Sequence, residues 1–124
     1  MSVDPTTNPV APTSRWMAAA RARESERADR LFDDPLAAAL AGPEGFAWLE
    51  RMESAARSDS PGVYPAIRTR FFDDFLLDAC RRSGVRQVVF AAAGLDTRAF
   101  RRIGHPRSVC TRWTYPRCWT PKRR

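Results

Sequence analysis

The sequence predicts an α/β fold in which several helices precede the start of a doubly wound parallel sheet. Two observations carry this prediction. Residues 14–83 contain stretches with helical periodicity and helix-end signals, whereas residues 85–91 form a short β-branched run, VRQVVFA, that leads into small residues and a glycine. Helices followed by a strand, a glycine turn and a further helix are typical of an open α/β domain with a helical N-terminal cap.

Three helices are expected in the first half of the chain. Ser14 suits the N-cap of an Ala- and Arg-rich helix over residues 15–27. Asp33-Asp34-Pro35 then marks the start of a second helix and Gly42 its end, and a third helix covers residues 44–57.

The fourth expected helix has the clearest periodicity. Ile67, Phe71 and Phe75 lie four residues apart and form an apolar stripe, while the charged side chains fall largely elsewhere. Pro65 suits the first turn of this helix, and Gly84 suits its end.

Two arginines, Arg68 and Arg70, lie in the first turns of the fourth helix. Guanidinium groups near a helix N-terminus are suited to bind a carboxylate or a phosphate. In the alternative, the two arginines are solvated and form ion pairs with Asp73 and Asp74. Without further context, the residue pattern favours this alternative.

The β-branched run predicts a buried parallel strand, with a helix opening at Asp96 or Thr97. Doubly wound sheets bind ligands outside the carboxyl ends of their strands, so residues 90–98 occupy the place of a ligand site. Gly94 allows a close approach of the backbone, but the full glycine fingerprint of dinucleotide-binding folds is absent. A plain strand, turn and helix is therefore the alternative.

The charge is concentrated at one end of the chain. The 124 residues carry a net charge of +7, yet residues 101–124 hold eight of the 21 Lys and Arg residues and none of the 14 acidic ones. The remainder is close to neutral. No apolar run is long enough to cross a membrane, and no secretory signal is visible, so we expect a cytoplasmic protein.

Metal binding has little support in the sequence. His105 is the only histidine, and its surroundings favour an exposed loop. Cys80, Cys110 and Cys118 show no zinc-ligand spacing, and Cys80 suits the apolar core.

Three strings are more specific than any single signal: RLFDDPLA at residues 30–37, RTRFFDD at residues 68–74 and AAGLDTRAF at residues 92–100. With their flanking residues, they make residues 14–103 resemble the N-terminal part of the actinobacterial S-adenosylmethionine-dependent methyltransferases related to leucine carboxyl methyltransferase.

This resemblance implies the start of a Rossmann-like class I methyltransferase fold, with the N-terminal helices as a lid and a sheet that is incomplete in this chain. The implied cofactor is S-adenosyl-L-methionine, and the implied reaction is methyl transfer to an oxygen of a small-molecule acceptor. Arg68 is the implied partner of the cofactor carboxylate. The implied cofactor turn consists of Ala92, Ala93, Gly94 and Asp96.

Composition and the resemblance together predict an organisation in four parts. Residues 1–13 are a flexible leader, residues 14–83 the helical lid, and residues 84–103 the first strand, cofactor turn and helix. Residues 104–124 have neither strand alternation nor helical period, and we expect them to be disordered.

The loss of sheet partners has a predicted consequence. With a single strand, the chain leaves the apolar side chains of its α/β part without cover. Val88, Phe90 and Phe100 are the ones that we expect to be exposed.

A frame change would explain the unusual C-terminal composition. Because Trp has one codon and all Thr codons begin with the same two bases, each Trp-Thr pair read one nucleotide earlier gives Asp, and Cys118-Trp119 gives Leu. With GC-rich codons, residues 109–124 then read VYEVDLPPVLDAEAA. This sequence begins with a strand that ends in an acid, as in the family that the chain resembles.

Two other classes of function are compatible with the residues. Trp113, Tyr115 and Trp119 alternate with arginines and could stack on single-stranded nucleic acid. A helical module that pairs the apolar stripe of its fourth helix with a partner protein is the third reading.

Overall fold

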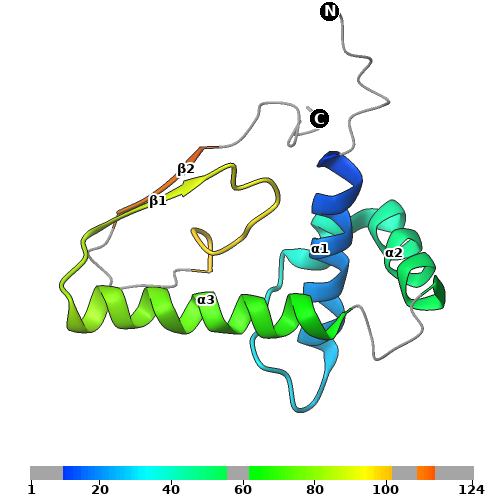
Figure 1. Ribbon diagram of the computed structural model, residues 1–124, viewed down its shortest axis with the longest axis horizontal. Coiled ribbons are helices and arrows are strands. Elements are labelled where there is room, and N and C mark those ends of the chain that lie inside the picture. Colours follow the sequence, from blue (N-terminus) through cyan, green and yellow to red (C-terminus); the bar gives the residue numbers. More distant parts are fainter. Residues whose placement is uncertain (1–9, 56–61, 102–108, 114–124) are drawn as a thin grey trace, which may run out of the picture. The chain divides into compact units, whose positions relative to one another are not determined.

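The computed structural model describes residues 10–55, 62–101 and 109–113. Its elements are α1 (Val10–Glu26), α2 (Ala37–Ala55), α3 (Val63–Arg82), β1 (Gln87–Ala91) and β2 (Val109–Trp113), shown in Figure 1. The chain divides into two compact units, an N-terminal unit of residues 1–67 and a C-terminal unit of residues 68–124.

Helix α1 begins earlier than its sequence predicts. It starts at Val10 and includes Ser14, so the expected N-cap at Ser14 and a leader that extends to residue 13 are both wrong. Pro12 lies in the first turn, where a missing backbone N–H leaves no intrahelical hydrogen bond unmade. The first turn therefore tolerates Pro12, although the Pro-, Thr- and Asn-rich composition of residues 1–13 predicts a leader.

Small residues allow α1 and α2 to approach closely. Ala18, Ala19, Ala20 and Ala22 of α1 are all buried. On α2, a Cβ atom added to Gly45 would lie 2.6 Å from the carbonyl oxygen of Arg15, which shows that the backbones of the two helices almost touch. The close contact between α1 and α2 is thus built from alanine and glycine, and Leu49 of α2 is a large apolar side chain that is fully buried in this unit.

The start and the break of α2 fall where the sequence predicts them. Asp34 is buried, and its carbonyl accepts a hydrogen bond from the backbone N–H of Ala37, the first residue of α2, at 3.1 Å. Gly42 has a left-handed φ of 59° and is followed by Pro43, so α2 consists of two helical segments joined by a kink. The expected helix boundary at Gly42 is confirmed.

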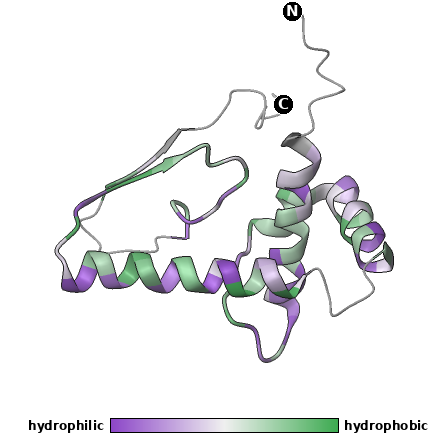
Figure 2. Ribbon diagram, viewed as in Figure 1, coloured by the Kyte–Doolittle hydropathy of each residue, from purple (hydrophilic) through white to green (hydrophobic). Residues whose placement is uncertain are grey.

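Helix α3 matches the fourth expected helix. It ends at Arg82, before Gly84 with its φ of 68°, and Cys80 near its end is buried as expected. The side chains of Ile67, Phe71 and Phe75 are 56–63% exposed. Figure 2 shows apolar and polar residues alternating along this helix.

Two strands form a parallel pair in the C-terminal unit. Gln87 lies opposite Val109, and the register continues to Ala91 opposite Trp113 (Figure 1). The expectation of a single strand, and of a tail without regular structure from residue 104, is therefore wrong for residues 109–113. Residues 102–108 and 114–124 lie outside the described residues.

Exposure of apolar side chains follows the expected pattern only in part. Phe100 is 53% exposed, as expected. Val88 and Phe90 are half-buried, whereas Val89, on the other face of β1, is 60% exposed. The strand is thus covered on one face more than on the other.

The helix expected to open at Asp96 or Thr97 does not form within the described residues. Instead, the carbonyl of Thr97 accepts hydrogen bonds from the N–H groups of Phe100 and Arg101, at 2.8 and 2.9 Å, which closes a single turn. In the described ranges, no helix is long and apolar enough to span a membrane.

Candidate functional site

The segment that follows β1 is a tight turn with unusual backbone angles. Ala92 and Gly94 both have a φ of 52°, in the left-handed region that favours glycine. The N–H of Asp96 donates a hydrogen bond to the carbonyl of Ala93 at 2.8 Å. Ala92 is exposed, and Ala93 and Gly94 are half-buried. The turn thus presents part of its backbone to solvent at the carboxyl end of a parallel strand.

The carboxylate of Asp96 is held in place locally. It accepts a hydrogen bond from the backbone N–H of Arg98 at 2.8 Å and a second, very short one from the guanidinium of Arg98. The Asp96 side chain is still 25% exposed. A carboxylate has more than two acceptor positions, so Asp96 can accept a further hydrogen bond from a ligand.

Asp73 of α3 binds the two arginines that follow the turn. Its carboxylate accepts from Nε of Arg98 at 2.7 Å and from Nη1 of Arg101 at 2.8 Å. Its side chain is only 7% exposed. The expectation of a solvated Asp73 is wrong, and the three residues Asp73, Arg98 and Arg101 form what we call the Asp73 cluster.

The spacing of Arg98 and Arg101 is a sequence signal for this cluster. Arg98 and Arg101 lie three residues apart after the strand, and a pair of cations there requires a carboxylate if both are buried. Asp73 is the carboxylate that meets this requirement, although the sequence pattern places it on a charged face of the helix.

Arg68 lies next to this cluster through a shared aromatic ring. Its guanidinium carbon is 5.6 Å from the centroid of the Phe72 ring, and that of Arg98 is 5.7 Å from the same centroid. Arg68 is exposed, and among the described residues no carboxylate forms an ion pair with it. Arg68 is thus linked to the segment after β1 only through the Phe72 ring, which it shares with Arg98.

Arg70 has a different environment. Its Nε donates to Oδ2 of Asp74 at 2.8 Å, one helical turn away on the exposed face of α3. This hydrogen bond raises the pKa of Arg70 above its ordinary value. The expected pairing with a neighbouring acid is therefore confirmed for Arg70, and Arg68 is the better candidate for an external anion.

The described residues contain two free thiols, Cys80 and Cys110. Burial raises the pKa of the Cys110 thiol above its ordinary value. Within the described ranges, no cluster of His, Cys, Asp or Glu could hold a metal ion. His105 and Cys118 lie outside those ranges.

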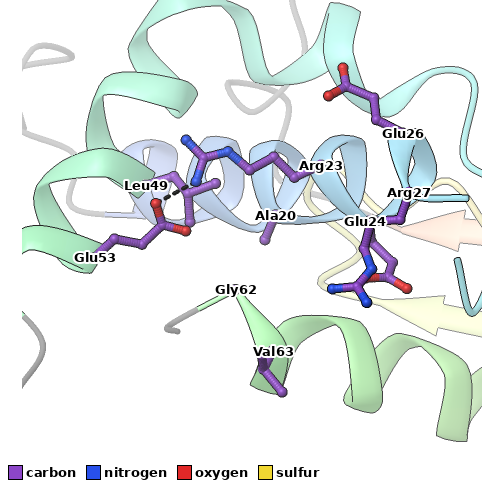
Figure 3. A pocket seen from close by; sticks show the side chains of 9 residues that line it. All are labelled: Ala20, Arg23, Glu24, Glu26, Arg27, Leu49, Glu53, Gly62 and Val63. Carbon is purple, nitrogen blue, oxygen red and sulfur yellow. Dashed lines mark hydrogen bonds and ion pairs between the residues drawn. The ribbon is translucent and has the colours of Figure 1, made fainter. Parts of the chain in front are cut away.

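A separate hollow of about 450 Å³ lies in the N-terminal unit. Figure 3 shows Arg23 and Glu53 joined across one side of it. Arg27, also on its wall, pairs with Asp29 at 2.8 Å, and Arg23 lies 3.9 Å from Glu50. Its cations are thus already engaged by acids, and it includes none of the residues expected to bind the cofactor.

Comparison with known proteins identifies the family. Residues 14–110 match the leucine carboxyl methyltransferase family. The chain therefore belongs to this family, and its helices followed by a parallel strand pair represent part of the α/β methyltransferase fold.

Several relatives carry the description "Putative S-adenosyl-L-methionine-dependent methyltransferase". One from Mycobacterium marinum is 46% identical over 101 residues, which cover 74% of this chain and 33% of the relative. One from Parafrankia sp. is 54% identical over 65% of this chain and 27% of the relative. One from Mycobacterium ulcerans is 43% identical over 81% of this chain and 35% of the relative. The chain thus spans about a third of the length of the relatives it matches.

Proposed function

We propose that this chain provides the cofactor-binding start of an S-adenosyl-L-methionine-dependent methyltransferase that methylates an oxygen of a small-molecule acceptor. The observation that carries the proposal is that Arg68, which has no carboxylate partner among the described residues, shares the Phe72 ring with Arg98. Arg98 in turn binds Asp96, which follows the left-handed turn at Ala92–Gly94. Membership of the leucine carboxyl methyltransferase family supports this assignment.

The residues present fit the amino-acid end of the cofactor. That end carries a carboxylate and an ammonium group. Arg68 supplies a positive charge for the carboxylate, and Asp96, which remains 25% exposed, supplies an acceptor for a hydrogen-bond donor. The turn at Ala92, Ala93 and Gly94 contributes backbone atoms that a ligand can approach closely.

The chemistry at this site depends on position. S-Adenosyl-L-methionine, when bound, supplies a methyl group on a sulfonium, which is a good leaving group. The protein therefore has to hold the acceptor oxygen in line with the methyl group rather than to activate it strongly. Arg68 and Asp96 serve this by fixing one end of the cofactor.

The organisation of the whole enzyme follows from the same proposal. Residues 14–83 form the helical lid, and residues 84–103 open the catalytic domain. The acceptor is a small molecule rather than a nucleic acid or a membrane, and the protein works in the cytoplasm. In the alternative reading frame the next strand ends in an acid where this chain has Trp113-Thr114, and we infer that such an acid would bind the ribose hydroxyls of the cofactor.

Cofactor titration of the ¹⁵N-labelled chain tests the proposal. We expect a dissociation constant on the order of 1 mM, because the chain supplies only part of the contacts that must offset the entropic cost of binding. Resonances of residues 92–96 should shift, and Arg68→Ala should abolish the shifts. Arg70→Ala, which removes a surface ion pair two residues along α3 from Arg68, is the matched control and should leave them unchanged.

Two outcomes would contradict this proposal. Shifts confined to the hollow of the N-terminal unit would place the cofactor elsewhere, and an unchanged response in Arg68→Ala would remove the role of Arg68. Catalysis is tested in a chimera of residues 1–108 with the C-terminal part of the Mycobacterium marinum relative, which should transfer a methyl group to a small acceptor.

A further inference from the structure

We propose that Asp73 is the positioning residue of the cofactor turn, acting through Arg98 on Asp96. The inference rests on the proposed function, since it assumes that the cofactor binds at this turn. Asp73 reaches the acidic residue of the turn, Asp96, through the side chain of Arg98.

The contacts form a continuous chain from α3 to the turn. The carboxylate of Asp73 accepts from Nε of Arg98 at 2.7 Å, and the guanidinium and backbone N–H of Arg98 both donate to Asp96. A third group of Arg98, Nη2, donates to the carbonyl of Thr69 on α3 at 3.3 Å. One arginine thus joins two positions of the helix to the acidic residue of the turn.

Arg101 adds a second connection to the same carboxylate. Its Nη1 and Nη2 donate to the two oxygens of Asp73 at 2.8 and 3.2 Å, and its Nε donates to Oγ1 of Thr97 at 3.2 Å. The side chains of Asp73, Arg98 and Arg101 are 7%, 13% and 8% exposed. Because the cluster is buried, its hydrogen bonds depend on one another, and losing Asp73 leaves two cations without their shared acid.

The geometry explains why a methyltransferase would use such a cluster. Arg68 and Asp73 lie on the same helix, so the helix carries both the charge proposed for the cofactor carboxylate and the group that fixes the turn. Phe72, between them in sequence, has the guanidinium groups of Arg68 and Arg98 within 6 Å of its ring centroid. The Asp73 cluster therefore sets the spacing between the two halves of the binding site.

The neighbouring ion pair provides a control within the same helix. Asp74 pairs with Arg70 at 2.8 Å, but both side chains are about half exposed and the pair stays within α3. Asp74→Asn removes the same charge as Asp73→Asn one residue away, without touching the turn.

The test compares the wild-type chain with Asp73→Asn, Asp73→Glu and Asp74→Asn, each ¹⁵N-labelled. In the absence of cofactor, we expect Asp73→Asn to increase hydrogen exchange at the backbone N–H groups of Arg98, Phe100 and Arg101 at least fivefold. Exchange in α1 should not change, which separates a local effect from general unfolding. Asp74→Asn should behave as the wild type.

Titration with S-adenosyl-L-methionine then measures the consequence for binding. Asp73→Asn should weaken binding at least fivefold at a temperature where α1 and α2 resonances remain native, and Asp73→Glu, which keeps the carboxylate, should restore part of the affinity. Equal binding by the wild type and Asp73→Asn overturns this inference and leaves the proposed function standing. No binding by any of the four chains overturns the proposed function, and the inference with it.

Discussion

Nε of Arg21 lies 2.8 Å from Oδ2 of Asp34, and the two side chains are 9% and 0% exposed. This buried ion pair connects the middle of α1 with the residue that opens α2. Ser25 strengthens the connection, because its hydroxyl donates to the carbonyl of Arg21 and accepts from the N–H of Asp34, at 2.8 and 2.9 Å. The sequence DDP is therefore both a helix start and an anchor for the preceding helix.

Asp34→Asn should destabilise the N-terminal unit by about 3 kcal/mol, because it leaves the buried guanidinium of Arg21 without its acid. Urea unfolding followed by circular dichroism measures the loss. Asp33→Asn, at the exposed neighbouring position, is the control and should change stability by less than about 0.5 kcal/mol. Similar losses in the two variants would show that the pair contributes nothing beyond a helix-start effect.

Gly45→Ala should destabilise the protein by about 2 to 3 kcal/mol, since the new methyl group would lie 2.6 Å from a backbone oxygen of α1. Gly84→Ala introduces a methyl group with no atom within 4 Å, at a φ of +68°. It should cost only the backbone strain, about 1 kcal/mol. Thermal unfolding of the two variants shows which one loses more stability. A larger loss in Gly84→Ala than in Gly45→Ala would contradict the close approach of α1 and α2.

Gly94→Val should weaken cofactor binding more than Arg68→Ala does. A β-branched residue resists the φ of 52° found at Gly94, and its side chain projects from the turn that the cofactor approaches. Gly84→Val imposes comparable strain at a φ of 68° outside the turn and is the control. Binding is measured in the chimera described above, where Arg68→Ala alone should cost about 1.5 to 3 kcal/mol.

Alkylation of Cys110 by iodoacetamide should be slower in the native chain than in urea at about pH 8. The raised pKa of the native thiol lowers the fraction of reactive thiolate at that pH. Because the native thiol has the higher pKa, its burial also makes the free energy of unfolding depend on pH. The contribution of Cys110 to that free energy is complete below the unfolded pKa and is lost as the pH rises through the native pKa. Mass spectrometry of the Cys110 peptide gives both rates, and equal rates would refute the effect of burial.

The sequence was sufficient to predict features with a local physical cause. The break at Gly42 follows from a residue that tolerates a left-handed φ, and the apolar stripe of α3 follows from its four-residue spacing. The turn at Ala92–Gly94 follows from small residues after a β-branched run. Each depends on a few neighbouring residues, so a short stretch of sequence contains the information.

Features that depend on distant partners were missed. Whether Asp73 lies on a solvated face or in a buried cluster is decided by Arg98 and Arg101, more than 20 residues away. Strand β2 was missed because VCTRW lacks a clear alternating pattern, and its strand conformation comes from the ladder it forms with β1. The early start of α1 was missed because residues 1–13 are rich in Pro, Thr and Asn and show no periodicity, yet the first turn of a helix tolerates a proline such as Pro12.

The parallel pair of β1 and β2 has a consequence for how the chain behaves in concentrated solution. In the described residues the sheet has only these two strands, so each strand has one side on which its backbone hydrogen-bonding groups face no further strand. Val89 and Val109 lie on the same face of the sheet and are 60% and 62% exposed. An open strand edge beside an exposed apolar face is a template for pairing with another chain, so the protein should form intermolecular sheet as its concentration rises.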